Sequence, residues 1–172
     1  FNWWYFDNTK ESNDPERWVK GNSTPIKGDK IVDYEMSAIT SLDDNFNIRE
    51  PRTASISVID DENDSNLQLL IDKILEAHEF TKIVKTEIAD NIFIDREERL
   101  DIIKIKIAIF EENGDRCFIG FVDKTSVELN KKTKVFSFSL IDPLYLYKVL
   151  IEDTGIPTER VKSENNRELT LQ

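Results

Sequence analysis

"IIKIKIAIFEENGDRCFIGFVDK", residues 102–124, carries the clearest fold signal in the chain. Isoleucine recurs at every second position from 103 to 109, with Lys104 and Lys106 between, which is the period-two pattern of a strand with one buried face. Asn113-Gly114 then separates this run from "CFIGFV" at 117–122, and Asn-Gly between two alternating runs is typical of a β-hairpin turn. The stretch predicts two antiparallel strands.

Further strands are predicted on both sides of this hairpin. At 30–40, Val32, Tyr34, Met36 and Ala38 alternate with polar residues and predict a half-buried strand. The same pattern predicts a strand at 53–60, and the polar residues 41–50 between the two indicate a loop. Strands are also expected at 81–89, at 125–129 and at 135–141, whereas the mixed charges of 95–99 suit a polar loop or the rim of an intersubunit contact.

Two helices are predicted. The first covers about 65–79, begins at a capping box of Ser65 and Gln68, and has acidic residues near its positive end. One face of this helix is apolar, formed by Leu67, Leu70, Ile71, Ile74, Leu75 and His78. The second is short and begins at Asp142-Pro143, an N-cap followed by proline at the first helical position.

This order of elements predicts a mainly β (α+β) fold. We expect an antiparallel β barrel or sandwich flanked by one amphipathic helix, with a short C-terminal helix. Residues 1–29 are interpreted as an aromatic N-terminal arm or loop, residues 30–152 as the β domain, and residues 153–172 as a polar linker or tail. A chain of 172 residues suits one domain of this kind with extensions.

Charge and composition exclude several classes of function. The net charge of −11 makes binding to nucleic acid through phosphate contacts improbable, since that binding depends on clustered Lys and Arg. It disfavours anionic membranes as well, and no apolar run approaches the roughly 20 residues that span a bilayer. The single cysteine, Cys117, rules out an intrachain disulfide and a multi-cysteine metal site.

No catalytic constellation is found in the sequence. His78 is interpreted as a core-boundary residue near a helix end, and Cys117 as a buried structural thiol. The acidic stretch 60–65 lacks the Gly and Glu that a calcium loop requires at its sixth and twelfth positions. We therefore predict that the chain is not an enzyme and holds no cofactor or metal; a carboxylate-dependent hydrolase is the weaker third possibility, for which no acid is nominated.

The first residues form an aromatic cluster whose burial must be explained. Large aromatic side chains are costly to leave in water, so we expect this cluster to pack on the domain or on a partner. Its members are candidate subunit-contact or partner-binding residues: Trp3, Trp4, Tyr5, Phe6 and Trp18. The alternative is a β-sandwich binding module that recognises carbohydrate or peptide, with these rings as a stacking platform.

Two segments resemble the tail hub and baseplate proteins of bacteriophages and phage-tail-like particles. They are "CFIGFVDKTSVELNKKTKVFSFSLIDPLYLYKVL" at 117–150 and "YEMSAITSLDDNFNIREPRTASISVID" at 34–60, and the resemblance covers roughly residues 30–150. The shared features are a strand that ends in Gly-Phe-Val-Asp, a paired strand, an alternating aromatic strand and Asp-x-Leu. These are degenerate strand patterns and not catalytic signatures.

This resemblance implies a tail-tube-like fold. Copies of the chain, or related tail proteins, would form a ring around the tail channel beside neighbouring tail or baseplate proteins, in a virion or tail-like particle assembled in the bacterial cytoplasm. Candidate core or wall residues are Phe118, Gly120, Phe121, Phe136, Phe138 and Leu140. Candidates for an acidic surface that keeps passing DNA from adhering are Asp60, Asp61, Glu62 and Asp64.

Overall fold

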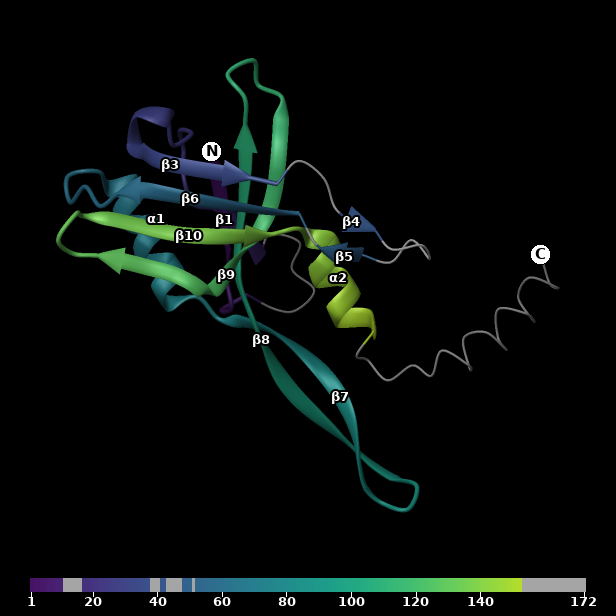
Figure 1. The fold of residues 1–172 in the computed structure, drawn as a ribbon. Helices are drawn as coiled ribbons and strands as arrows, with labels where there is room; N and C mark the ends of the chain where they lie inside the picture. Colours follow the sequence, from purple (N-terminus) through teal and green to yellow (C-terminus); the bar gives the residue numbers. More distant parts are fainter. Residues whose placement is uncertain (11–16, 38–40, 43–47, 51, 153–172) are drawn as a thin grey trace.

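A computed structural model describes residues 1–10, 17–37, 41–42, 48–50 and 52–152 of the chain. Strands dominate it, and the main sheet is antiparallel throughout (Figure 1). The elements are β1 (Asn2–Phe6), β2 (Trp18–Lys20), the 3-10 turn η2 (Gly28–Lys30), β3 (Ile31–Met36), β4 (Ser41–Leu42), β5 (Ile48–Glu50), β6 (Thr53–Ile59), α1 (Ser65–Glu76), β7 (Glu79–Ala89), β8 (Ile92–Phe110), β9 (Arg116–Asn130), β10 (Val135–Ile141) and α2 (Pro143–Glu152).

The main sheet is a single path of strands in the order β2-β1-β8-β9-β10-β6-β3, with β7 paired to β8 beside it. Figure 1 shows β8 crossing β10 and β6 at a steep angle, so the sheet folds over on itself. Among the described residues no strand pairing joins β2 to β3, and the barrel is therefore open along that side. The predicted mainly β, antiparallel fold is confirmed.

Strand β8 is the longest strand and pairs with three others. Its first part, Ile92–Ile103, pairs with β7, and its later part pairs with β9 on one edge and with β1 on the other. A register shift between Ile102 and Lys106 in the β8–β9 pairing marks the place where its partners change. β7 pairs with β8 as far as Ile103, and β1 pairs with Ile105–Ala108. The two strands therefore lie one after the other along the same edge of β8.

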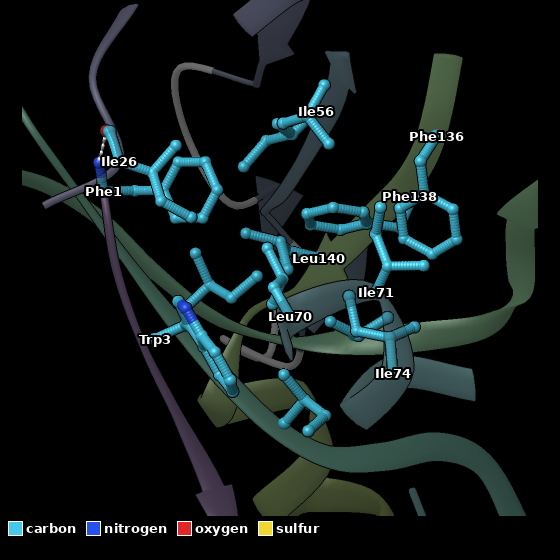
Figure 2. Packing of buried hydrophobic residues seen from close by; sticks show 14 of the residues in the cluster. Phe1, Trp3, Ile26, Ile56, Leu70, Ile71, Ile74, Phe136, Phe138 and Leu140 are labelled. Atoms are coloured by element: carbon cyan, nitrogen blue, oxygen red, sulfur yellow. Dashed lines mark hydrogen bonds between the residues drawn. The ribbon is translucent and has the colours of Figure 1, made fainter. Parts of the chain in front are cut away.

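The predicted hairpin at 102–124 is confirmed. Its turn brings Gly114 to a φ of 89°, a conformation that favours glycine, and the alternating isoleucines Ile103, Ile105 and Ile107 are fully buried. Figure 2 shows how residues from β1, β6, β10 and α1 meet in one core. That core unites Phe1, Trp3, Ile26, Ala54, Ile56, Val58, Leu67, Leu70, Ile71, Ile74, Ile103, Ile105, Ile107, Phe118, Val122, Phe136, Phe138 and Leu140.

Helix α1 packs its apolar stripe on the sheet as predicted, but its ends differ from the prediction. Asp64 is the N-cap, and its carboxylate accepts hydrogen bonds from the backbone amides of Asn66 and Leu67. The predicted capping box of Ser65 and Gln68 is wrong, because the Gln68 amide donates to Asp60 Oδ1 instead. The helix ends at Glu76, so His78 lies beyond it, and Leu75, expected on the apolar face, is exposed. Asp142 and α2 follow the prediction, with Asp142 Oδ1 accepting from the Leu144 amide at 2.8 Å.

The prediction that residues 1–29 form an arm or loop is wrong. Residues 2–6 form β1 inside the main sheet, and residues 18–20 form its neighbour β2. Residue 26 is held beside residue 1 by two backbone hydrogen bonds, one of which is drawn in Figure 2. The segment is structured because its aromatic residues pair with the buried part of β8, which supplies partners for both the backbone and the side chains.

Three further expectations are corrected by the pairing of the strands. β3 is an edge strand with a register shift between Ile31 and Asp33, so Val32 and Tyr34 are exposed and only its end residues pack on the core. Residues 95–99, expected to be a loop, continue β8 opposite β7. Within the predicted loop 41–50, the short strands β4 and β5 pair antiparallel. Ala38 and the tail 153–172 lie outside the described residues.

Candidate assembly surface

The outer face of the sheet carries a cluster of aromatic rings and cations from five segments. Alternation along β1 sends Trp3 and Tyr5 to the core side and their neighbours outward, and alternation along β8 sends Lys104 and Lys106 outward as well. The cluster consists of Trp4, Phe6, Trp18, Phe80, Phe121, Arg17, Lys104 and Lys106. We call it the aromatic–lysine cluster. All of its members are partly buried.

The rings of the cluster touch in a chain that crosses four strands. Phe6 meets Trp18 edge to face with ring centroids 5.3 Å apart, and Trp18 lies 5.8 Å from Phe121. Phe121 in turn meets Phe80 edge to face at 5.1 Å. Such geometry is favoured by the ring quadrupoles and adds to the apolar area that the rings bury. The chain of rings therefore ties β2, β9 and β7 together.

Cations cover the faces of these rings. Lys106 Nζ lies 5.0 Å from the centroid of Trp4 and 5.1 Å from that of Trp18, and Lys104 Nζ lies 4.6 Å from Phe6. Burial lowers the pKa of both lysines, and Arg17 lowers that of Lys104 further by like-charge repulsion. Trp4, Phe6 and Trp18 therefore each have a cation of the same chain near the ring.

The aromatic residues singled out in the sequence thus divide between two environments. Trp3 is fully buried, and Tyr5 packs against the core with Lys73 Nζ 4.6 Å from its ring centroid. Trp4, Phe6 and Trp18 belong to the aromatic–lysine cluster. All five therefore pack on their own domain, which was one of the two alternatives.

The residues proposed as core or wall are mostly core. Phe118, Phe136, Phe138 and Leu140 are buried together, whereas Phe121 faces outward into the aromatic–lysine cluster. A Cβ atom at Gly120 would lie 2.8 Å from the backbone oxygen of Ile141 and 2.7 Å from the Phe118 ring, so this position requires the close approach expected of it.

The four acidic candidates surround the start of α1. Asp64 caps the helix, Asp60 accepts from Gln68, and Glu62 lies 3.5 Å from Lys134. The backbone amide of Asn63 and the ammonium group of Lys30 hold the pKa of Asp61 below its ordinary value. These contacts give the acids a role in fixing the β6–α1 connection.

A two-stranded ribbon, formed by β7 and the first part of β8, extends from the sheet (Figure 1). Residues 81–99 of β7 and β8 pair only with each other, and Figure 1 shows them reaching well past the other strands. We call this ribbon the projecting hairpin. A two-residue turn, Asp90-Asn91, closes it, with Asn91 at a φ of 60°. Its large apolar residues are about half exposed or more: Ile83, Ile88, Ile92, Phe93 and Ile94.

Exposed apolar residues on an isolated ribbon need a physical reason. Two strands alone are marginally stable in water, and a run of large apolar side chains near one tip favours contact with another surface. Charged residues are interleaved with them, and Lys82 Nζ lies 3.6 Å from Glu98 across the ribbon. The hairpin therefore exposes apolar and charged side chains together.

The aromatic–lysine cluster anchors the base of the projecting hairpin. Phe80 is the last β7 side chain before the hairpin leaves the sheet, and it contacts both Phe121 and Lys104. The backbone amide of Lys104 also donates to the His78 carbonyl at 2.9 Å. Glu79 and Lys124 form an ion pair beside them. These contacts set the direction in which the hairpin projects.

We predict that Phe80→Ala loosens the projecting hairpin without unfolding the sheet. Loss of the Phe80–Phe121 contact removes about 1 kcal/mol of local stabilisation. Amide hydrogen exchange of 81–89 should accelerate by about fivefold, while the amides of β10 keep their protection. Phe110→Ala, at an exposed ring on the far end of β8, is the matched control and should leave 81–89 unchanged. Equal acceleration in both variants would refute the anchoring role.

Neither a metal-binding cluster nor a membrane-spanning helix is found in the part of the chain that the structure describes. No cluster of three or more His, Cys, Asp or Glu residues is placed to bind a metal ion there. Cys117 is half-buried, with Sγ 3.4 Å from the Ile109 carbonyl oxygen, and His78 is exposed. Within the same residues, neither helix has the length and apolar character needed to cross a membrane.

Comparison of the chain with protein-family models, with curated proteins and with solved structures gave no significant match.

Proposed function

We propose that this chain is a structural component of a bacteriophage tail or tail-like particle, of hub, baseplate or distal-tail type. Copies of it, or related tail proteins, assemble into a ring around the tail channel. The observation that carries the proposal is the projecting hairpin, because its large apolar residues are about half exposed and its two strands pair only with each other. The resemblance of residues 34–60 and 117–150 to tail proteins is the reason for proposing a phage tail or tail-like particle as the assembly.

The arrangement of the fold supports an assembly role. The core of the sheet, on which α1 packs, holds the base of the hairpin through the aromatic–lysine cluster. A rigid base matters because a mobile ribbon would lose conformational entropy on binding and weaken the contact. The net charge of −11 disfavours non-specific adhesion of passing DNA.

Immunogold electron microscopy tests this function. Antibody against the chain is applied to lysates of the source culture after prophage induction. We expect gold at one end of tail-like particles. Clean particles without gold, with soluble antigen in the same lysate, would overturn the tail assignment and favour the carbohydrate- or peptide-binding alternative.

A variant of the projecting hairpin tests the observation behind the proposal. We expect Ile88→Ser combined with Phe93→Ser to remain folded by circular dichroism and to be lost from purified particles. The matched control is Leu75→Ser, since Leu75 is 59% exposed, close to the 60% of Ile88, but lies on α1. Normal incorporation of the double variant would show that the hairpin is not the assembly contact.

A further inference from the structure

The first part of β8 has a free edge on the side that faces away from β7. β7 pairs with the opposite edge of this part, and β9 first pairs with β8 at Ile102. Among the described residues no strand therefore covers the outer edge of residues 92–101, and Figure 1 shows this part of the ribbon reaching past the other strands. Such an edge presents unpaired backbone N–H and C=O groups, which are a template for a further strand.

Symmetry limits how a second copy of the same edge can pair with it. In an antiparallel ladder, hydrogen-bonded and non-hydrogen-bonded residue pairs alternate. A two-fold axis between two identical strands must therefore pass between two copies of one residue. The free stretch lies between the turn of the projecting hairpin and the first residue that pairs with β9. Only a centre at Arg96 or at Glu97 uses nearly the whole of it.

The charges along the edge match when the centre is Glu97. Arg96 then lies opposite Glu98, and Asp95 lies opposite Arg99. The two-fold axis repeats each of these pairs, so every arginine on the edge meets a carboxylate of the other copy. Opposite charges that face each other across two strands stabilise the pairing.

The other centre does not match. With Arg96 on the axis, Asp95 would face Glu97 twice and the two arginines would face each other, and like charges in these positions are destabilising. With Glu97 on the axis, the two Glu97 carboxylates are the like-charge contact, and Ile94 gains an apolar partner in Leu100. The length of the free edge and its charge pattern therefore favour the same register.

The two arginines lack acidic partners in their own ribbon. β7 places Val84 opposite Arg96 and Thr81 opposite Arg99. Both arginines are exposed, and among the described residues no salt bridge joins either of them to a carboxylate. A second copy would supply the carboxylates that the ribbon itself does not.

We propose that two copies of the chain pair antiparallel through residues 93–101 of β8, about a two-fold axis at Glu97. The strands then form one sheet in the order β7-β8-β8-β7, in which the free edges of both copies of β8 are covered. The contact is isologous and closes with two copies. It therefore goes beyond the ring proposed above, which needs a contact between different surfaces.

Disulfide trapping tests the axis, because Glu97 would face its own copy. The full chain carries Cys117→Ser and Glu97→Cys. Directly opposite residues of an antiparallel pair have Cα atoms about 4.5–5.5 Å apart, within the range that a disulfide spans. We expect the linked dimer at about tenfold the yield given by Glu87→Cys, an exposed glutamate of β7. Asp95→Cys should also give little, since the register places it opposite Arg99.

Exchanging charges between two chains supplies an independent readout. Arg99→Glu brings like charges together at Asp95, and we expect the dissociation constant of the dimer in analytical ultracentrifugation to rise about tenfold. Asp95→Lys should weaken the dimer in the same way, whereas a mixture of the two variants restores opposite charges and should form the heterodimer. These positions are used because Glu98 already contacts Lys82 in its own ribbon. Circular dichroism verifies that each variant is folded.

Removing the like charges on the axis should have the opposite effect. We expect Glu97→Gln to tighten the dimer by about threefold. Glu87→Gln changes the net charge by the same amount away from the axis and is the matched control. Equal effects of the two variants would mean that general repulsion, and not this register, governs association.

The outcomes judge this contact separately from the tail assignment. A wild-type chain that stays monomeric at about 100 μM would overturn the pairing and leave the charges of 95–99 as a guard against edge pairing. Equal trapping at positions 87, 95 and 97, or a mixture of charge variants that fails to associate, would also overturn it. Immunogold labelling of particles uses the wild-type chain and tests the tail assignment alone, so either result can fail without the other.

Discussion

Trp3→Ala should lower the free energy of unfolding by about 3–5 kcal/mol, the largest loss that we expect from any single side chain. The Trp3 indole is completely buried and belongs to the same core as α1, β6 and β10. Its removal leaves a cavity that the neighbouring strands cannot fill, since they are held by pairing on both sides. Urea unfolding followed by circular dichroism measures the loss.

Two further variants make this prediction specific. Trp4→Ala is the matched control, because Trp4 is the same residue type one position along β1 but lies on the outer face beneath Lys106. We expect it to cost about 1 kcal/mol. If Trp3→Ala proves too unstable to purify, Trp3→Phe should still show a clear fall in the urea midpoint. Equal losses at positions 3 and 4 would contradict the assignment of the two faces of β1.

Gly21→Ala should produce the second large effect, about 2–3 kcal/mol, although it adds only one methyl group. A Cβ atom at Gly21 would lie 2.3–2.4 Å from three atoms of the Trp3 ring. The Gly21 amide also donates to the Trp3 carbonyl at 2.9 Å, so the backbone cannot retreat without breaking that bond. Gly28→Ala is the control, since nothing lies within 4 Å of its added carbon.

A double-mutant cycle identifies the cause of the Gly21 effect. Trp3→Phe removes the outer ring atoms that the new methyl group would meet. In that background Gly21→Ala should cost at least about 1 kcal/mol less than in the wild type. A cost that is the same in both backgrounds would mean that contact with Trp3 is not the source of the destabilisation.

The sequence predicted strands well where a single face of the strand is buried. Isoleucines of β8 and phenylalanines of β10 alternate with polar residues, so the period-two pattern records directly which side meets the core. The start of α1 was less predictable. Asp60, Asp64 and Ser65 are all plausible caps from residue type alone, and the backbone path from β6 decides among them.

Residues 2–6 were misread because the pattern that predicts a strand is absent from them. Both faces of "NWWYF" carry large aromatic residues, since one face meets the core and the other meets Lys104 and Lys106. The aromatic–lysine cluster was equally hidden, because its members come from segments far apart in the sequence and meet only once β1, β8 and β9 are paired.

The strand at 81–89 was predicted, but its pairing with residues 92–99 in a projecting hairpin was missed. Most side chains of residues 81–99 are exposed, so the sequence does not show which face of the ribbon would meet a core. The Asp90-Asn91 pair was the one local signal, since short turns with a residue at positive φ favour Asn. The length of the ribbon could not be inferred from that turn.

The continuity of β8 has a mechanical consequence. One unbroken strand runs from the tip of the projecting hairpin into the centre of the sheet, where β1 and β9 flank it. A pull on the tip is therefore transmitted along the β8 backbone, and the hydrogen bonds to β1 and β9, which lie across the strand axis, are loaded in shear and share the force. The barrel can bear tension applied through a thin ribbon without peeling open one bond at a time.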